Sequence, residues 1–411
     1  TPLAHRANPR LLFSNIGLPQ ARSSPTRGVL VSNRDAVIVG AVRTPVGVGK
    51  PGKSLSGVHP GDLSATVLDA LVTRAGVDPA LVDDVLWGCV SQVGEQGVNI
   101  ARNATLAAGF PESVPGTTID RQCGSSQQAV HFAAAGLVAG HYDLVVAGGV
   151  ESMSRVPMFS NMVGGDGPFP PKMLERYDGR LVPQGLSAEM IADRWKLSRE
   201  QLDEIALASR ERAAAATDEG RFADEIVPVG DVSVDEGIRR ETSLEKLAGL
   251  RPAFREDGVV TAGNSSQISD GSAALLLTTS DKARELGLTP LARIHTVALA
   301  GVDPVIMLTG PIPATAKALE RSGLTMGDIG AFEVNEAFAA VLAAWYADTG
   351  ADPKLTNPNG GAIALGHPLG GSGARLMTTL VHHMKRENVR YGLQTMCEGG
   401  GMANATILEL L

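Results

Sequence analysis

Stretches that read as buried strands alternate with helical patterns along most of this chain. Residues 35–44 (DAVIVGAVRT) and 83–92 (DDVLWGCVSQ) have the apolar, β-branched character of buried strands. Between them, residues 61–76 place apolar side chains at helical spacing, and the alternation resumes at residues 269–279. Because strands that alternate with helices usually form a parallel sheet covered on both faces, we expect an α/β fold with a mostly parallel sheet.

The two halves of the chain share a weak internal repeat. In the first half, a Gly/Ser-rich turn at Cys123 opens a helix that ends at Gly140, and the next strand stops at Gly148 and Gly149. In the second half, the segment GHPLGGSGARLMTTLVHHMKR opens a helix, and the strand YGLQTMC is followed by a run of glycines. We therefore expect two pseudo-equivalent halves whose turns meet at one place.

Composition suggests how these halves are divided along the chain. With 411 residues, the chain is too long for one ordinary core. Residues 153–266 are rich in charge and proline, and we expect an inserted loop subdomain there. The N-terminal half would then comprise residues 35–152, completed by residues 267–290, and the C-terminal half would comprise residues 291–411.

Residues 1–34 differ from the rest of the chain. They contain five arginines, several serines and no acidic residue. Organellar transit peptides share this composition, but no strong amphipathic period is visible here. We therefore interpret the segment as an N-terminal tail outside the fold.

Charge, hydropathy and cysteine content exclude several classes of protein. The formal net charge of −8 and the lack of any Lys/Arg block argue against nucleic-acid binding. No apolar run is long enough to span a membrane. The three cysteines form no disulfide framework and no pair with zinc-site spacing, so we expect no metal and a reducing, cytoplasmic location. Arginine in excess of lysine hints at a GC-rich bacterial genome.

Two polar residues at the glycine-rich turns are candidates for nucleophilic chemistry. Cys123 stands where a helix begins, so the helix N-terminus would favour its thiolate; the alternative is a small buried residue. His367 lies in the loop GGAIALGHPLGGSGAR, where it could activate a thiol. A phosphate-binding loop is the alternative for this segment, but the Lys of the Walker pattern is absent.

Two further segments place reactive or polar groups in apolar surroundings. Cys397 ends a strand just before Gly399, and a glycine run there allows backbone N–H groups to point at a bound atom; an inert thiol is the alternative. Asn335 and Glu336 interrupt an apolar run in VNEAFAA. Either they cap a helix, or the buried polarity belongs to a site.

Together these motifs resemble the thiolase family. The segments QCGSSQQAVHFAAAGLVAGHYDLVVAGGVESMS, GNSSQISDGSAA, NEAFAA, GGAIALGHPLGGSGAR and CEGGGM occur in the family's order and spacing, and the resemblance covers about residues 35–411. It implies the thiolase fold, in which two pseudo-equivalent α/β halves form a layered α-β-α-β-α core with an inserted loop subdomain.

The resemblance also implies a ping-pong acyl transfer. His367 would take the proton of Cys123, whose thiolate would attack a 3-ketoacyl-CoA. Cys397 would protonate the departing acetyl-CoA carbanion or, in the reverse Claisen condensation, deprotonate acetyl-CoA. Asn335 would hold a water that forms one oxyanion hole with His367, and the N–H groups of Cys123 and Gly399 would form the second.

The resemblance implies that coenzyme A is a co-substrate and not a permanently bound cofactor. The family pattern places its binding residues mainly in the inserted subdomain. The matching positions are Arg239, Phe254, Ala262, Ser266 and Phe338. For Arg239, a solvated surface charge is an equal alternative. The family also implies a homodimer or a homotetramer that acts on coenzyme A thioesters.

The chain departs from the family pattern at two places near the acyl pocket. Pro183 and Gln184 replace a His-Met pair of many short-chain enzymes, and CEGGGMAN replaces the common CIGGGMG. These changes leave open the acyl chain accepted, including a steroid side chain. Two alternative functions on the same fold are a decarboxylating ketoacyl synthase, which lacks a thiol at the position of Cys397, and a non-catalytic lipid carrier, which would lack part of the catalytic set.

Overall fold

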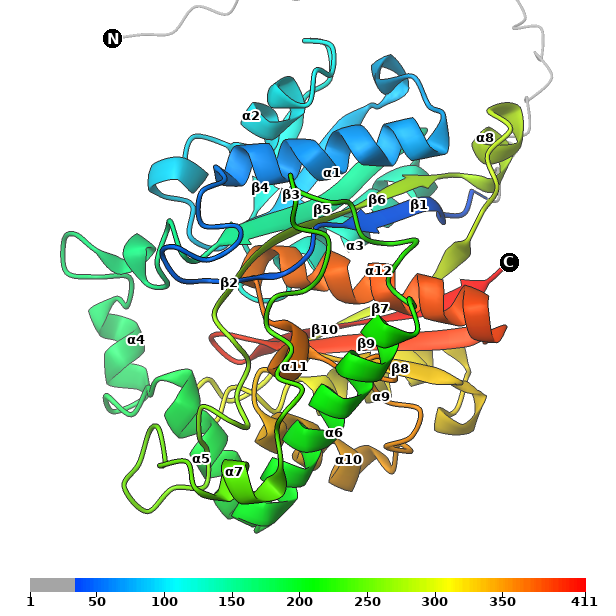
Figure 1. Ribbon diagram of the computed structural model, residues 1–411. Helices are drawn as coiled ribbons and strands as arrows, with labels where there is room; N and C mark the ends of the chain where they lie inside the picture. The colour runs from blue at the N-terminus through cyan, green and yellow to red at the C-terminus, as the bar shows by residue number, and fades with distance from the viewer. Residues whose placement is uncertain (1–33) are drawn as a thin grey trace, which may run out of the picture. The chain divides into compact units, whose positions relative to one another are not determined.

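A ten-stranded sheet is the framework of residues 34–411, the part of the chain that this computed structural model describes (Figure 1). The strands are β1 (Val37–Arg43), β2 (Gly47–Val48), β3 (Asp84–Gly88), β4 (Gly116–Ile119), β5 (Leu144–Ser152), β6 (Ser269–Thr278), β7 (Ala292–Gly301), β8 (Ala331–Val334), β9 (Tyr391–Glu398) and β10 (Met402–Leu410). The helices are α1 (Pro60–Ala75), α2 (Ile100–Ala107), α3 (Ser125–Ala139), α4 (Pro171–Arg176), α5 (Gln184–Trp195), α6 (Arg199–Asp218), α7 (Leu244–Ala248), α8 (Ser280–Glu285), α9 (Pro311–Ser322), α10 (Ala339–Thr349), α11 (Ala362–Leu365) and α12 (Leu369–Glu387). The tail expected at residues 1–34 lies, apart from Arg34, outside the described residues.

The strand order repeats one pattern in both halves of the sheet. The order is β4-β3-β5-β6-β1 and then β7-β10-β9-β8. In the first half, β3 and β5 are parallel, and β6 and β1 follow antiparallel. In the second half, β8 and β9 are parallel, and β10 and β7 follow antiparallel. This correspondence confirms the two pseudo-equivalent halves.

The expectation of a mostly parallel sheet was wrong. Only the pairs β3–β4, β3–β5 and β8–β9 run parallel in the described sheet, and its remaining pairs are antiparallel. For β9 and β10 the reason is the short turn at residues 399–401, which reverses the chain so that β10 pairs antiparallel with β9. The two halves also join into one sheet, through the pairs Val37–Arg293 and Ile38–Ala292.

Helices and strands form five layers (Figure 1). Helices α3 and α12 pack against each other in the centre, and one buried cluster joins them to strands of both halves, including β1, β5, β6, β8 and β10. Helices α1 and α2 cover the outer face of the first half, and α9 covers the outer face of the second, with α10 packed against it. The layered α-β-α-β-α core is therefore confirmed.

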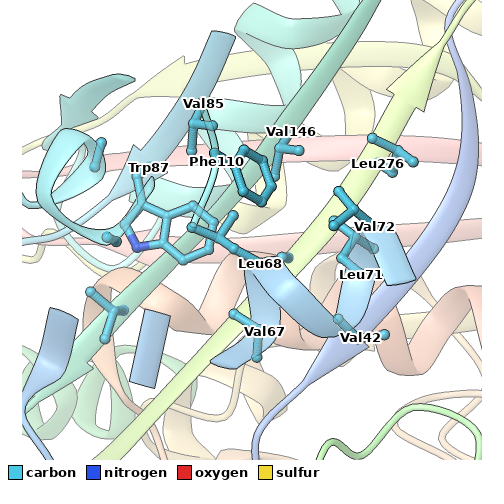
Figure 2. Close-up of a cluster of buried hydrophobic side chains, with 14 of the residues drawn as sticks. Val42, Val67, Leu68, Leu71, Val72, Val85, Trp87, Phe110, Val146 and Leu276 are labelled. Atoms are coloured by element: carbon cyan, nitrogen blue, oxygen red, sulfur yellow. The ribbon is translucent and has the colours of Figure 1, made fainter. Parts of the chain in front are cut away.

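The outer layer of the first half is held by a large apolar cluster. Figure 2 shows Trp87 and Phe110 packed with Leu68 and Leu71 of α1 against the sheet. These side chains are almost fully buried, and the Trp87 indole N–H donates a hydrogen bond to Ser64 Oγ at 3.1 Å. Burying side chains of this size contributes about 1.5–3 kcal/mol each.

Glycines bring the starts of the two central helices close to the sheet. A Cβ at Gly149 would lie 2.3 Å from the carbonyl oxygen of Gly370 in α12, and one at Gly88 would lie 2.3 Å from the Ser126 nitrogen in α3. The expectation that Gly148 and Gly149 end the strand was wrong, because β5 continues to Ser152. Position 149 requires glycine because the backbone of α12 comes close to it, not because the strand turns at this point.

Residues 153–266, all of which the structure describes, contribute helices α4 to α7 and no strand of the sheet. Helices α5 and α6 pack on α10, and α6 also packs on α11. No helix between residues 34 and 411 is long and apolar enough to cross a membrane.

Candidate active site

Cys123 lies in a tight turn just ahead of α3. The helix begins at Ser125, two residues later than the sequence predicts, and Gly124 is its N-cap. Gln122 adopts a left-handed conformation, with φ of 49°. The Ser125 hydroxyl closes the turn, because it accepts the Arg121 N–H at 2.9 Å and donates to the Gln122 carbonyl at 2.6 Å. The turn therefore presents a buried thiol, not a residue of the helix itself.

The expectation that the helix N-terminus favours the Cys123 thiolate was wrong. Burial, together with the nearby Glu398 carboxyl, raises the pKa of Cys123 to about 12, although the backbone N–H groups of Cys123 and Gly399 partly oppose this rise. Desolvation of a buried charge outweighs the partial charge of the helix end. The thiol is therefore neutral at rest and needs a base to lose its proton.

His367 is buried between Gly366 and the start of α12, with Nδ1 bonded to Ser372 and Nε2 facing Asn335. Ser372 Oγ donates its only hydrogen to the Pro368 carbonyl at 2.8 Å, so it must accept from His367 Nδ1–H at 2.6 Å. Nε2 then carries the lone pair. Burial and the charge of Arg375 lower the pKa of His367 to about 3, which keeps the imidazole neutral.

Ser372 is thus a positioning residue for His367. We expect Ser372→Ala to lower kcat/KM for thioester cleavage by about ten- to a hundredfold, since an unpaired buried N–H costs about 1–3 kcal/mol and the tautomer is no longer fixed. Steady-state kinetics test this, with circular dichroism as the folding control. Ser372→Thr keeps the hydroxyl and should recover most of the loss; equal activity in wild-type and Ser372→Ala proteins would contradict the role.

Asn335 faces His367 and does not cap a helix. The N-cap of α10 is Phe338, three residues later, and its side chain makes no capping bond. Asn335 Nδ2 lies 3.4 Å from His367 Nε2, and the Asn335 Oδ1 atom is buried without a protein partner. The backbone N–H of Asn335 bonds the Thr395 carbonyl at 3.0 Å, which fixes it beside β9. An amide with an unfilled acceptor beside an imidazole lone pair is suited to hold a water.

Glu336, the other polar residue of the motif, has a structural role. Its carboxylate accepts hydrogen bonds from Ser209 of α6 at 2.6 Å, from Asn357 at 2.8 Å and from the Ile363 N–H at 3.1 Å. A Cβ at Gly361 would lie 2.3 Å from its carboxyl carbon. Glu336 therefore holds α6, the loop at Asn357 and the start of α11 next to the segment that carries Asn335.

Cys397 lies at the end of β9 and shares one site with Cys123. Burial raises the pKa of the Cys397 thiol well above its usual value, and the Cys123 thiol contributes to this rise, so the two sulfurs are within electrostatic reach of each other. The backbone N–H of Gly399, two residues after Cys397, lies close enough to the Cys123 sulfur to lower the pKa of that thiol. The end of β9 therefore lies near the turn that carries Cys123.

Glu398 is an unexpected neighbour of the two thiols. Its side chain is fully buried, both carboxyl oxygens lack a protein partner, and a Cβ at Gly124 would lie 2.0 Å from Oε1. Burial raises the pKa of Glu398 to about 8, although Arg121 opposes the rise. The carboxyl group is therefore mostly protonated at neutral pH.

This shift predicts a pH-dependent stability difference. The usual pKa of 4.5 applies to the unfolded chain, so between about pH 4.5 and 8 the unfolded state releases the Glu398 proton while the folded state keeps it. In this pH range, the Glu398 proton should lower the free energy of unfolding of the wild-type protein by at most about 1.4 kcal/mol for each unit of rising pH. Glu398→Gln stays neutral, so it should gain a few kcal/mol over wild type near pH 8–9 and nothing below about pH 4.5.

Urea unfolding of both proteins at several pH values measures this difference. Glu320→Gln, at an exposed position on α9, is the matched control and should show no comparable trend. A difference between wild type and Glu398→Gln that does not change with pH would contradict the protonated state.

A basic pocket of about 360 Å³ lies among the segments assigned to coenzyme A. Four cationic side chains line it: Arg210, Arg239, Arg240 and Lys246. Asp218 pairs with Arg240 at 2.7 Å, and Glu241, which also lines the pocket, lies 3.9 Å from Lys246. Arg210 and Arg239 have no ion pair among residues 34–411, and Arg239 is exposed. The pocket therefore carries a net positive charge that suits phosphate groups.

The other residues assigned to coenzyme A lie next to the pocket wall or to the cluster that contains Cys397. Phe254 and Phe338 form an edge-to-face pair with centroids 5.8 Å apart. The Ser266 N–H bonds the Ala337 carbonyl at 2.9 Å, and Ala262 adjoins Gly263 of the pocket wall. One apolar cluster contains Leu247 of the pocket, Phe338 and Cys397. Arg239 thus lines the pocket, Ala262 adjoins its wall, and Phe338 shares a cluster with Cys397.

Sequence reasoning assigned no role to Ser372, Gln122 or the carboxyl of Glu398. For Ser372, the signal was its place five residues after His367 in GHPLGGSG. Nothing in the sequence indicated that Glu398 points at Gly124. Among residues 34–411, no group of three or more His, Cys, Asp and Glu side chains is arranged to hold a metal ion.

Comparisons of the chain with known proteins all point to one family. The family models described as "Thiolase, N-terminal domain" and "Thiolase, C-terminal domain" match residues 36–281 and 288–410. A steroid 3-ketoacyl-CoA thiolase of Mycobacterium tuberculosis is 49% identical, over 98% of this chain and 100% of that protein. A 3-ketoacyl-CoA thiolase of Bacillus subtilis is 44% identical, over 92% of this chain and 100% of that protein. The crystal structure of the Bacillus anthracis acetyl-CoA acetyltransferase has a TM-score of 0.84 at 41% identity, over 92% of this chain and 100% of that chain.

Proposed function

The chain belongs to the thiolase family and is an acyltransferase, and we propose that Cys123 and Cys397 divide its chemistry between acyl transfer and proton transfer on 3-ketoacyl-CoA. The observation that carries this proposal is the proximity of two buried thiols, close enough for Cys123 to raise the pKa of Cys397, with the Gly399 N–H beside the Cys123 sulfur. Two thiols suit a reaction in which one stays acylated while the other moves a proton.

In the first half-reaction, His367 Nε2 takes the proton of Cys123, and the thiolate attacks the 3-keto carbon. The N–H groups of Cys123 and Gly399 stabilise the oxygen that becomes negative. The bond between carbons 2 and 3 then breaks, and the Cys397 thiol gives its proton to the acetyl-CoA carbanion. Asn335 holds the water that, with His367, stabilises the enolate oxygen. Acetyl-CoA leaves, and the shortened acyl group stays on Cys123.

In the second half-reaction, the Cys397 thiolate takes the proton of free coenzyme A. The coenzyme A thiolate attacks the acyl group on Cys123, and Cys123 leaves as a thiolate that recovers its proton from His367. Each group thus ends in its initial state. The reverse sequence is a Claisen condensation.

The alternative functions fit these residues less well. A decarboxylating ketoacyl synthase has no use for a thiol at the position of Cys397, and that thiol lies at the site. A non-catalytic lipid carrier would lack part of the set, whereas this chain has every member of it, and the proximity of Asn335 to His367 and of Cys397 and Gly399 to Cys123 supports one catalytic set.

For coenzyme A, we propose that the basic pocket takes the nucleotide phosphates and that the path past Phe338 takes the pantetheine arm. The net positive charge of the pocket and the apolar cluster that runs from Leu247 to Cys397 support this orientation. Residues 153–266 would then act as the inserted lobe over the site, between the halves at 35–152 with 267–290 and at 291–411.

We also propose a homodimer, or a pair of such dimers, joined through the edge strand β4. This strand ends the sheet and pairs only with β3. Exposed apolar side chains occur on the two helices that pack beside β4, at Leu106 of α2 and Phe132 of α3. An uncovered edge with apolar neighbours favours pairing with a second copy about a two-fold axis. A stable, active monomer in sedimentation would contradict this assembly.

A reducing, cytoplasmic location is proposed on the basis of the thiols. Cys89, Cys123 and Cys397 are all buried and unpaired. Catalysis by two free thiols requires a compartment that keeps them reduced.

Thiolysis of 3-ketoacyl-CoA substrates of increasing chain length tests the proposed function. We expect cleavage that requires free coenzyme A, releases acetyl-CoA, and follows ping-pong kinetics with parallel double-reciprocal plots. Sequential kinetics, or release of carbon dioxide from malonyl-CoA without thiolysis, would overturn the proposal.

A further inference from the structure

Two glutamine amides lie over Gly399, next to the nucleophile. A Cβ added to Gly399 would lie 3.1 Å from Gln122 Oε1 and 3.3 Å from Gln184 Nε2. The backbone N–H of this same glycine lies close enough to the Cys123 sulfur to lower the pKa of that thiol. An acyl group on Cys123 that occupies the Gly399 oxyanion hole therefore starts beside both amides.

Gln122 offers a hydrogen-bond acceptor there. Its side-chain nitrogen lies 3.3 and 3.4 Å from the two carboxylate oxygens of Asp120, and Asp120 also accepts the Gln122 backbone N–H at 2.7 Å. Because the nitrogen faces Asp120, the Gln122 Oε1 atom is the one that faces Gly399.

Gln184 offers a group that is still free to bond. It is the first residue of α5, and its side chain makes no hydrogen bond with any other part of residues 34–411. It is half-buried, and Phe254 covers the neighbouring Gly185 so closely that a Cβ there would lie 2.2 Å from the ring. The start of α5 is therefore held in place, with an unpartnered amide facing the site.

We propose that Gln122 and Gln184 form a polar recognition pair that selects oxygenated acyl groups over plain alkyl chains. A hydroxyl group within a few carbons of the ketone can donate to Gln122 Oε1 and accept from Gln184 Nε2; a ketone can accept from Gln184. A plain alkyl chain would instead bury these amides without partners. This proposal rests on the proposed thiolase function and names its substrate class.

The expected preference is moderate because both amides are only partly buried. A bond left unmade at such a site lowers specificity by about ten- to a hundredfold. An acidic acyl group is disfavoured, since Asp120 and Gln122 Oε1 present negative charge and an acceptor on that side.

The test compares matched 3-ketoacyl-CoA pairs of equal length, one with an alkyl chain and one with a hydroxyl or ketone oxygen near the thiolysed ketone. We expect wild-type kcat/KM to favour the oxygenated member by about ten- to a hundredfold. Gln184→Met, which keeps the side-chain length and removes the amide, should bring this ratio close to one, mainly by raising kcat/KM for the alkyl member.

Gln92→Met, at an exposed position outside the site, is the matched control and should leave the ratio unchanged. A wild-type ratio near or below one overturns the proposal whether or not the variant folds, as does an unchanged ratio in folded Gln184→Met. If none of the substrates is thiolysed, the proposed function itself fails, which is a distinct result.

Discussion

Cys123→Ala is expected to lose thiolysis by at least about 10⁴-fold, because no other group can carry the acyl intermediate. Cys397→Ala should lose thiolysis and condensation to a similar degree but for a different reason. It lacks the proton donor for the carbanion, whereas its Cys123 and His367 remain intact. It should therefore still exchange the acetyl group between acetyl-CoA and labelled free coenzyme A, more slowly than wild type, because coenzyme A must enter as its own thiolate without Cys397 to take its proton.

Exchange of label between coenzyme A and acetyl-CoA, measured beside thiolysis, separates these two roles. Cys89→Ala is the matched control, since Cys89 is a buried thiol in the apolar cluster below α1. It should retain both activities. If Cys397→Ala lost acetyl exchange as completely as Cys123→Ala, the division of labour between the thiols would be wrong.

Asn335→Asp is expected to depress thiolysis by about 10²- to 10³-fold in a protein that still folds. The substitution is isosteric, but it replaces the amide donor that lies 3.4 Å from His367 Nε2. It places an acidic group where the enolate oxygen becomes negative, in a site with little water to screen it.

Thermal unfolding and thiolysis measured together test this expectation. Asn103→Asp, at an exposed position on α2, is the control and should alter neither property much. Near-normal turnover in folded Asn335→Asp protein would show that Asn335 has only a structural role.

The reactive residues could be predicted from the sequence because their chemistry depends on local patterns. The turn at Cys123, the loop around His367 and the glycines after Cys397 are each visible in short segments. The end of α3 at Gly140 is also local, because a residue with φ of 79° at a helix C-cap favours glycine.

Other features depend on what folds against each segment, and the sequence does not display that. The direction of β6 depends on where the chain returns after residues 153–266, so alternation alone predicted too much parallel pairing. Gly149 looked like a strand end because the approach of Gly370 is visible only in three dimensions. The Cys123 thiol is neutral because the fold buries it and places Glu398 near it. Both effects come from parts of the chain that are distant from Cys123 in the sequence.

The site of acylation is the measurement that tests the central claim most directly. Wild-type protein is incubated with acetyl-CoA, quenched in acid, digested, and mapped by mass spectrometry. The peptide that contains Cys123 should carry one acetyl group, the peptides with Cys89 and Cys397 should carry none, and free coenzyme A added before the quench should remove the label. Acetylation of Cys397 in place of Cys123, or a wild-type enzyme that turns over without any acetyl-Cys123, would contradict the account.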